Sequence, residues 1–224
     1  MKSALPKVLQ TLAGKPLLEH VLVTANQLVG KAKTKPIVVI GHGASAITAY
    51  LEQIQKNHPG LADAVTVMQK EQKGTGHALL QALPKLDLDE PTLVLYGDVP
   101  LISKKTLMRL VTLADGKRGS DSALALLTQQ MENPTGYGRI LRDAEGAVTG
   151  IVEEKDADPK QKNISEINTG IMVLPSSRLK KWLKSLQATN AQGEYYLTDV
   201  IAMASRDNVP IRTTQADFEW ETIG

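Results

Sequence analysis

Short apolar runs alternate with amphipathic stretches along the first half of the chain. Three runs are of strand length and rich in branched apolar residues: Ile37–Ile40, Ala64–Met68 and Thr92–Tyr96. Around them, apolar residues recur at three- and four-residue intervals, which predicts helices over residues 16–29, 45–57, 77–83 and 103–114. Alternation in this order is typical of βαβ units, whose successive strands lie parallel.

Residues suited to helix ends flank these segments. Pro16 fits the first position of the first helix, and Gly30 follows its last apolar residue. Ser45 and Ser103 can cap the second and fourth helices. Near the start of the chain, Pro6 has a fixed φ, so the lysine after it is presented from a turn or a first helical position.

The pattern changes in the second half. Ala123–Leu127 and Ile167–Leu174 are strand candidates, while Ile140–Arg142 and Val148–Glu153 flank turn-forming residues and predict an antiparallel hairpin. Two helices and a strand complete the chain, over residues 176–186, 198–205 and 211–215. We therefore expect one α/β domain over residues 1–224, with a mixed but mostly parallel sheet flanked by helices.

Composition narrows the class of protein. The 224-residue chain is 42% hydrophobic, and its formal net charge of +2 does not indicate a nucleic-acid partner. It contains no cysteine, which excludes disulfides and thiolate chemistry. Apolar runs fall short of the roughly 18 residues of a membrane span, and the first ten residues lack the apolar core of a signal peptide. We therefore expect a cytoplasmic protein with no membrane partner.

Glycine-bearing loops follow the three apolar runs of the first half. Residues 41–43, 74–76 and 97–98 each lead toward a predicted helix start, where free N–H groups favour anions. Together these loops favour a phosphate-bearing ligand, although one such glycine often serves packing alone. Asp98 lies just past its strand and can hold Mg²⁺ and, through it, phosphate oxygens. The alternative is that Asp98 only caps a turn before Pro100.

Polar residues beside the apolar strands of the second half are candidates for binding sugar hydroxyls. They lie within residues 135–139, at Glu153 and within residues 168–170. The alternatives are an exposed strand end for Glu153 and a bulge or turn for Asn168.

Other kinds of site find less support. Residues 41–46 fit a permissive dinucleotide-binding pattern, but a whole helix precedes them and no acidic residue cleanly ends the next strand. The four histidines lack the spacing of a zinc site, and no G-x-S-x-G segment indicates a serine hydrolase.

Seven segments together resemble one enzyme family. They are LPKVL at residues 5–9, GTGHA at 74–78, YGDVPL at 96–101, PTGYGRI at 134–140, IVE at 151–153, EINTG at 166–170 and GEYYLTD at 193–199. In this order, over nearly the whole chain, they resemble the uridyltransferase domain of bacterial bifunctional N-acetylglucosamine-1-phosphate uridyltransferase/glucosamine-1-phosphate acetyltransferases. The resemblance implies a Rossmann-like nucleotidyltransferase fold that makes UDP-N-acetylglucosamine and pyrophosphate from UTP and N-acetylglucosamine 1-phosphate.

The resemblance also implies roles for single residues. Lys7 would neutralise nucleotide phosphates, and Asp98 would hold the Mg²⁺ cofactor. Gln69, Gly74 and Thr75 would contact uracil. Tyr96 and Gly97 would line the sugar side. Gly138, Glu153 and Asn168 would bind N-acetylglucosamine.

Some parts of the family pattern fall beyond this sequence. The family's Gly-rich loop, L-x-x-G-x-G-T-R-M, would end at Met1, and an asparagine that is its second metal ligand would follow Gly224. The hexapeptide-repeat acetyltransferase domain, through which full-length members would form homotrimers, is also outside. We therefore expect a chain trimmed at both ends, which by itself is poorly stable and essentially inactive.

The implied chemistry needs no general base. A sugar phosphate has a second pKa of about 6, so its attacking oxygen is largely ionised at neutral pH. Catalysis would consist of positioning and charge neutralisation for in-line attack on the α-phosphorus, in the synthesis of cell-wall precursors for peptidoglycan and lipopolysaccharide. Two alternatives stay open: a related sugar-phosphate, cytidylyl or guanylyl nucleotidyltransferase, and a non-catalytic nucleotide-sugar-binding protein.

Overall fold

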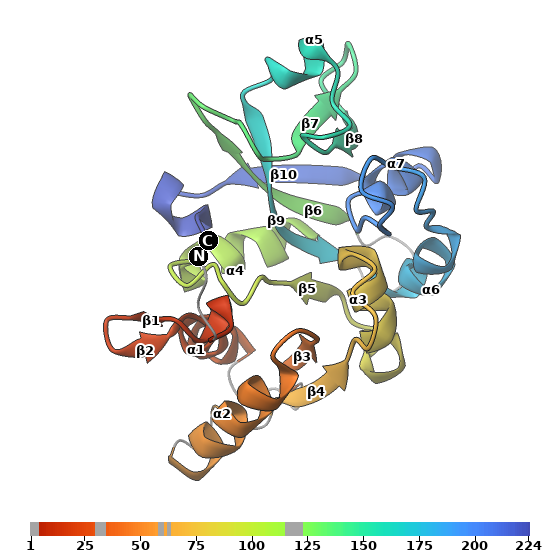
Figure 1. The fold of residues 1–224 in the computed structure, drawn as a ribbon. Helices are drawn as coiled ribbons and strands as arrows, with labels where there is room; N and C mark the ends of the chain where they lie inside the picture. Colours follow the sequence, from red (N-terminus) through yellow and green to blue (C-terminus); the bar gives the residue numbers. More distant parts are fainter. Residues whose placement is uncertain (1–4, 30–34, 58–60, 62–63, 115–122) are drawn as a thin grey trace.

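A six-stranded sheet forms the centre of the fold (Figure 1). The computed structural model describes residues 5–29, 35–57, 61, 64–114 and 123–224. The sheet has the order β10-β6-β9-β7-β8, and β5 pairs with β9 outside that path. Its strands are β5 (Thr92–Val94), β6 (Leu124–Gln130), β7 (Arg139–Arg142), β8 (Val148–Val152), β9 (Glu166–Leu174) and β10 (Ile211–Gln215). Each was predicted from the sequence to within three residues at either end.

The sheet is mixed, as expected, but antiparallel pairing dominates it. Among the described strands, parallel pairing joins β6 to β10 and, in a separate two-stranded ladder, β3 (Ile37–Ile40) to β4 (Val65–Met68). Strand β9 is antiparallel to β5, β6 and β7, and β7 forms the expected hairpin with β8. The prediction of a mostly parallel sheet, with Thr92–Tyr96 as one of its parallel strands, is therefore wrong. A fully buried strand is apolar whichever way its partner runs, so the run alone does not report direction.

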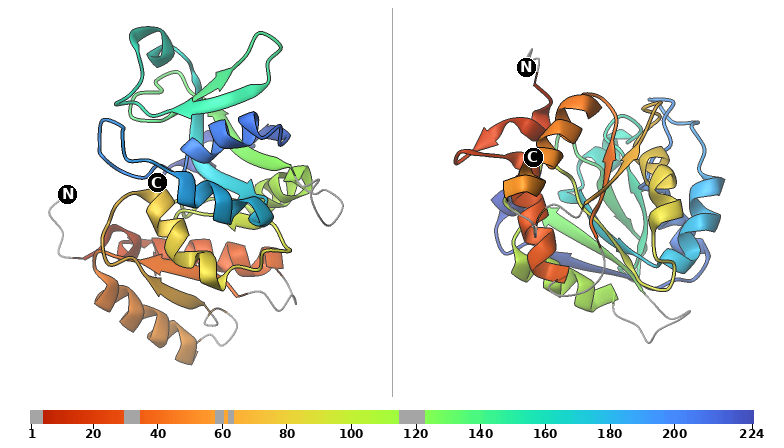
Figure 2. Two further views of the ribbon diagram at one scale, coloured as in Figure 1. Left: turned by 90° about the vertical axis from the view of Figure 1, so that its right-hand side faces the viewer. Right: turned by 90° about the horizontal axis from the view of Figure 1, so that it is seen from below.

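Helices cover both faces of the central sheet (Figure 2). Helices α3 (Thr75–Ala82), α6 (Ser176–Ser185) and α7 (Asp199–Arg206) cover one face, and α4 (Lys104–Ala114) covers the other. The other described helices are α1 (Leu17–Val29), α2 (Ala44–Asn57) and α5 (Pro159–Lys162). The sequence did not predict several short elements: β1 (Thr11–Leu12), β2 (Lys15–Pro16), α5 and the 3-10 turns η2 (Leu83–Lys85) and η3 (Glu219–Thr222). No helix in the described part of the chain is long and apolar enough to cross a membrane.

Two predicted helix starts are displaced. Pro16 lies in β2, one residue before α1, and Ser45 lies inside α2 rather than before it. Ser103 caps α4 as expected, since its Oγ accepts a hydrogen bond from Thr106 N–H at 3.1 Å. The expected end of the first helix at Gly30 lies outside the described residues.

Strand β6 shows why both faces of the sheet are apolar. Leu124 and Leu126 pack with α3, α6 and α7, whereas Ala125 and Leu127 pack on the opposite face with α4. All four side chains are fully buried. The continuous apolar run thus follows from period-two alternation between two covered faces.

A third apolar cluster holds the N-terminal part together. It joins η1 (Lys7–Leu9), α1, β3 and α2 through Leu9, Leu18, Leu22, Ile40, Ile47 and Leu51. In Figures 1 and 2, α2 and β3–β4 lie on the side of the molecule away from the β7–β8 hairpin. Strand β5 lies between them in Figure 1, so segments from both halves of the sequence lie near the loop after β5.

Candidate active site

Lys7 and Asp98 are in contact although 91 positions separate them. Lys7 opens η1 directly after Pro6, as expected, and Asp98 follows β5. Lys7 Nζ donates to Asp98 Oδ2 at 2.8 Å, with 58% of the lysine and 29% of the aspartate side chain exposed. A partly exposed pair of this kind stabilises the fold by at most about 1 kcal/mol. Each charge can therefore leave the other for a ligand at low energetic cost.

The loop that carries Asp98 packs against the N-terminal segment. A Cβ placed on Gly97 would stand 3.3 Å from side-chain carbons of Val8 and Leu18, so the backbone approaches η1 and α1 closely. Val99 N–H donates to the Tyr96 carbonyl at 3.2 Å and closes a turn around Asp98. Packing accounts for the glycine here, and contact between Gly97 and a substrate stays a prediction.

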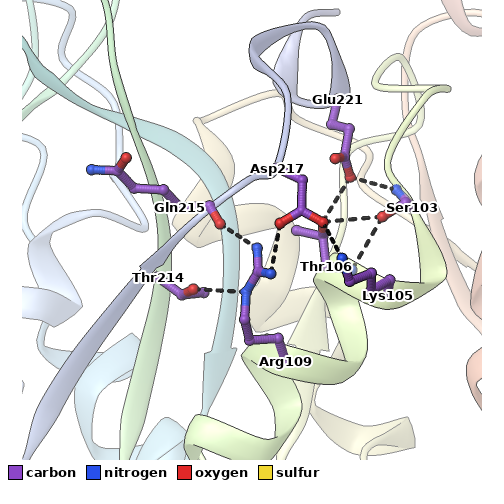
Figure 3. A network of polar contacts seen from close by, with 8 residues as sticks. All are labelled: Ser103, Lys105, Thr106, Arg109, Thr214, Gln215, Asp217 and Glu221. Carbon is purple, nitrogen blue, oxygen red and sulfur yellow. Dashed lines mark hydrogen bonds and ion pairs between the residues drawn. The ribbon is translucent and has the colours of Figure 1, made fainter.

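A buried carboxylate anchors the C-terminal segment on α4 (Figure 3). Glu221 is 1% exposed, and its Oε2 accepts hydrogen bonds from Ser103 N–H at 3.1 Å and from Thr106 Oγ1 at 2.7 Å. Nearby, Asp217 forms ion pairs with two basic residues of α4 at 2.8 Å each. These contacts hold residues 217–221 against the start of α4, directly after the Asp98 loop.

This anchoring brings Gly224 to Asp98. A Cβ placed on Gly224 would stand 2.8 Å from the Asp98 carbonyl oxygen, so the two backbones lie side by side. Sequence reasoning missed Glu221, because one glutamate between Trp220 and Thr222 carries no periodic pattern that marks it as buried.

Gln69, Gly74 and Thr75 are brought together where β4 leads into α3. Gln69 is buried, and its Nε2 donates to the Gly74 carbonyl at 3.0 Å and lies 3.1 Å from His77 Nδ1. Gly74 has a φ of +102°, and a Cβ there would stand 2.7 Å from the Tyr195 carbonyl, so only glycine fits. Thr75 Oγ1 accepts a hydrogen bond from a backbone N–H 122 positions away, at 3.1 Å.

Tyr96 links this group to the second half of the chain. Its ring lies against Gly170, whose φ is +83° and where a Cβ would stand 2.5 Å from Tyr96 Cε2. Burial, followed by the negative charges of Glu153 and Asp98, raises the pKa of Tyr96 to about 12. A hydrogen bond with the Thr75 side chain acts in the opposite direction. The phenol therefore stays protonated at neutral pH and lies within the fields of both candidate carboxylates.

Gly138, directly before β7, Glu153, directly after β8, and Asn168 on β9 form a second group. Asn168 N–H donates to the Gly138 carbonyl at 2.8 Å, and a Cβ on Gly138 would stand 3.1 Å from Glu153 Oε2. Asn168 is 8% exposed, and its Oδ1 accepts from Gly170 N–H at 3.0 Å. The β6–β9 pairing shifts register beside Asn168, so this residue does border a bulge, as the structural alternative expected.

Glu153 is half-buried rather than an exposed strand end. Its Oε1 accepts a hydrogen bond from Thr198 Oγ1 at 2.8 Å. Burial raises the pKa of Glu153 above its usual value, and the charges of Asp156 and Asp199 act in the same direction. A carboxylate held in this way is poised to accept hydrogen bonds from a ligand that replaces lost water.

The loop at residues 41–43 packs between Pro6 and Gln72. Gly43 packs on the Pro6 ring, and a Cβ on Gly41 would stand 3.1 Å from Gln72 Nε2. Packing thus accounts for both glycines.

In the described residues, no three histidine or acidic side chains are grouped to hold a metal ion. Asp98 can contribute one carboxylate, because no hydrogen bond from the described residues reaches its Oδ1. Mg²⁺ in proteins often takes only one or two carboxylates and completes its shell with water and phosphate oxygens. Asp98 fits a site of that kind.

The sequence of nearly the whole chain is that of a nucleotidyltransferase. The chain belongs to the nucleotidyl transferase family, whose model matches residues 2–224. Among named relatives it is similar to the bifunctional protein GlmU, with 52% identity over 225 residues to that of Burkholderia vietnamiensis and 51% over 224 residues to that of Burkholderia ambifaria. Each match covers 100% of this chain and 46% of the relative, so the chain spans about half the length of these relatives.

Solved structures of UDP-glucose pyrophosphorylase share the fold. The form complexed with UDP-glucose has a TM-score of 0.68 and the apo form 0.69, each at 17% identity over 94% of this chain and 82% of that chain. The likeness confirms the expected α/β class, with a mixed central sheet flanked by helices.

Proposed function

We propose that this chain transfers UMP from UTP to N-acetylglucosamine 1-phosphate, giving UDP-N-acetylglucosamine and pyrophosphate. The contact between Lys7 and Asp98 carries the proposal, because it joins a cation suited to a triphosphate and a carboxylate suited to a metal ion. The 52% identity to bifunctional GlmU proteins supports the same reaction. We further propose that residues 1–224 form one uridyltransferase domain, that it works in the cytoplasm for cell-wall precursor synthesis, and that full-length proteins of this kind assemble as homotrimers through a further domain.

On the phosphate side, the Lys7 ammonium leaves Asp98 and neutralises the phosphates of UTP. Asp98 is then free to hold Mg²⁺. When bound, Mg²⁺ supplies charge neutralisation and alignment of phosphate oxygens. The exposed pair of Lys7 and Asp98 makes this exchange of partners inexpensive.

On the sugar side, Asn168 and Glu153 offer complementary groups. Asn168 Oδ1 is taken by Gly170 N–H, which leaves its amide hydrogens to donate to a ligand. Glu153 Oε1 is taken by Thr198, which leaves Oε2 beside Gly138 to accept from a sugar hydroxyl or amide. The protonated Tyr96 lies close enough to Glu153 and Asp98 for both charges to act on it, and it can orient the sugar phosphate.

The sugar phosphate attacks without a general base, because it is ionised at neutral pH. Catalysis then consists of holding its oxygen in line with the α-phosphorus while positive charge offsets the charge on the phosphates. The base side would be read by Gln69, Gly74 and Thr75.

The test is pyrophosphate release from UTP and N-acetylglucosamine 1-phosphate by the complete gene product, with CTP and GTP in parallel. Asp98→Asn should lower the rate about a hundredfold or more, since a metal ligand supplies several kcal/mol. Asp207→Asn is the matched control, because Asp207 also pairs with a lysine at 2.8 Å and is exposed to a similar degree, but lies at the end of α7. Activity of Asp98→Asn within about threefold of the wild type would show that the metal assignment is wrong. Exchange of labelled pyrophosphate into UTP separates turnover from binding alone.

A further inference from the structure

The amide of Gln69 has one orientation set by its surroundings. Gln69 follows β4, where its N–H donates to the Ile40 carbonyl at 2.8 Å, and its side chain is 8% exposed. One end of the amide lies 3.0 Å from the Gly74 carbonyl oxygen. A carbonyl oxygen only accepts, so the amide group facing it is the NH₂.

The same NH₂ group fixes the tautomer of His77. Gln69 Nε2 lies 3.1 Å from His77 Nδ1, and Gln81 Nε2 lies 3.2 Å from His77 Nε2 and 3.4 Å from the His77 carbonyl oxygen. A neutral imidazole accepts at one nitrogen and donates from the other. The Gly74 carbonyl fixes the Gln69 NH₂ beside Nδ1, so Nδ1 accepts and the hydrogen of His77 is on Nε2. The Gln81 amide then turns its oxygen to the ring to accept that hydrogen, and gives up its own 3.4 Å hydrogen bond to the His77 carbonyl.

With its nitrogen engaged twice, Gln69 offers a ligand only an acceptor. No hydrogen-bond donor in the described part of the chain reaches Gln69 Oε1. Uracil carries an N–H at position 3, whereas cytosine carries a lone pair there. A freely rotating glutamine amide can serve either base by turning over. Turning over Gln69 would place its oxygen against the Gly74 carbonyl and His77 Nδ1, and both hydrogen bonds would be lost.

We propose that His77 is a positioning residue that sets base specificity: it holds Gln69 with its amide oxygen toward the ligand, so that the site selects uracil over cytosine nucleotides. The inference rests on the proposed function in taking Gln69 as the residue that reads the base. It goes further in naming His77 as the residue that prevents the Gln69 amide from turning over. His77 lies on α3 and need not touch the nucleotide.

The test is a comparison of the dissociation constants of UTP and CTP, measured with Mg²⁺ by calorimetry on the complete gene product. His77→Leu removes the acceptor at Nδ1 and should lower the preference for UTP about five- to tenfold, the range for one hydrogen bond. His77→Asn keeps an acceptor near that position and should retain most of the preference. His20→Leu changes a histidine that bonds the Leu12 carbonyl and should leave the preference unchanged.

Melting temperatures show whether His77→Leu remains folded. If it does not, Gln81→Met frees the tautomer while keeping His77, and a smaller loss of preference in the same direction is expected. A folded His77→Leu variant, or Gln81→Met, that keeps the wild-type preference within about twofold overturns the inference and leaves the proposed uridyl transfer intact. A wild-type protein that does not prefer UTP to CTP overturns both.

Discussion

Arg139 offers the sharpest test of how the sugar side is held in place. The residue is 1% exposed, and its Nη1 donates to the Tyr137 carbonyl. Its Nη2 donates to Glu154 Oε2 at 2.7 Å and to the Lys162 carbonyl at 3.3 Å. Arg139 thus ties β7 to the segment after β8 and to the end of α5. Gly138 directly precedes Arg139 in the sequence, and Glu153 directly precedes its carboxylate partner, Glu154.

The substitution Arg139→Met keeps the stem of the side chain and removes the guanidinium. Two bonds from a cationic donor to backbone carbonyls are lost, each worth about 1.5–3 kcal/mol when the donor is charged. Part of this loss is offset, because the substitution also removes Arg139 Nε, which is buried without a hydrogen-bond partner in the described structure. We expect a net loss of about 3 kcal/mol in the free energy of unfolding, with no contribution counted for the bond to the partly exposed Glu154.

A control lies on the same strand. Arg142 makes a bidentate ion pair with Glu166 at 2.7–2.8 Å and donates to the Gly146 carbonyl at 2.8 Å and to Thr213 Oγ1 at 3.1 Å. These bonds lie at the surface, where 33% of the Arg142 side chain is exposed and water can replace a lost donor. Arg142→Met should therefore lose only about 1 kcal/mol. In urea unfolding and calorimetry, the two variants should melt about 6–12 °C and 2–4 °C below the wild type.

Catalysis adds an independent readout. At a temperature where both variants are folded, Arg139→Met should raise the KM for N-acetylglucosamine 1-phosphate and leave that for UTP unchanged, because Gly138 and Glu153 flank the lost contacts. Equal melting temperatures for the two variants, or an equal rise in both KM values, would refute the reasoning.

Three further predictions follow from the same structure. Asn168→Ala should weaken sugar-phosphate binding about tenfold or more, through its lost bond to the ligand, with UTP affinity unchanged in titration calorimetry; an equal loss of both affinities would make the residue structural. Because the pKa of Glu153 is raised on folding, its ionisation destabilises the fold at neutral pH. Glu153→Gln should therefore be more stable than the wild type at pH 7, and the difference should vanish below about pH 4; a constant difference across that range would contradict the assignment. Glu221→Ala leaves Ser103 N–H and Thr106 Oγ1 without their acceptor and should lower the free energy of unfolding by about 3 kcal/mol in urea titration, whereas a loss below 1 kcal/mol would count against the buried anchor.

The sequence by itself determined the longer strands and helices and the residue types of the candidate site. Periodicity located the strands of the central sheet, because alternating burial repeats locally whatever the topology. The stretch after Thr92–Val94 was marked by a glycine and an aspartate at a strand end. The structure places Asp98 there, beside Lys7. The resemblance of short segments named the family, and the family match confirms it.

Only the tertiary structure decided how these parts meet. The antiparallel direction of β5 against β9 depends on the path of the chain between them, and an apolar run looks the same in either direction. The contact between Lys7 and Asp98, the burial of Glu221 under α4 and the orientation of Gln69 between Gly74 and His77 are equally invisible in the sequence. Most of these contacts join residues far apart in the chain, where local pattern carries no information about distance. The orientation of an amide is set by the acceptors that surround it, and those are assembled only when the chain is folded.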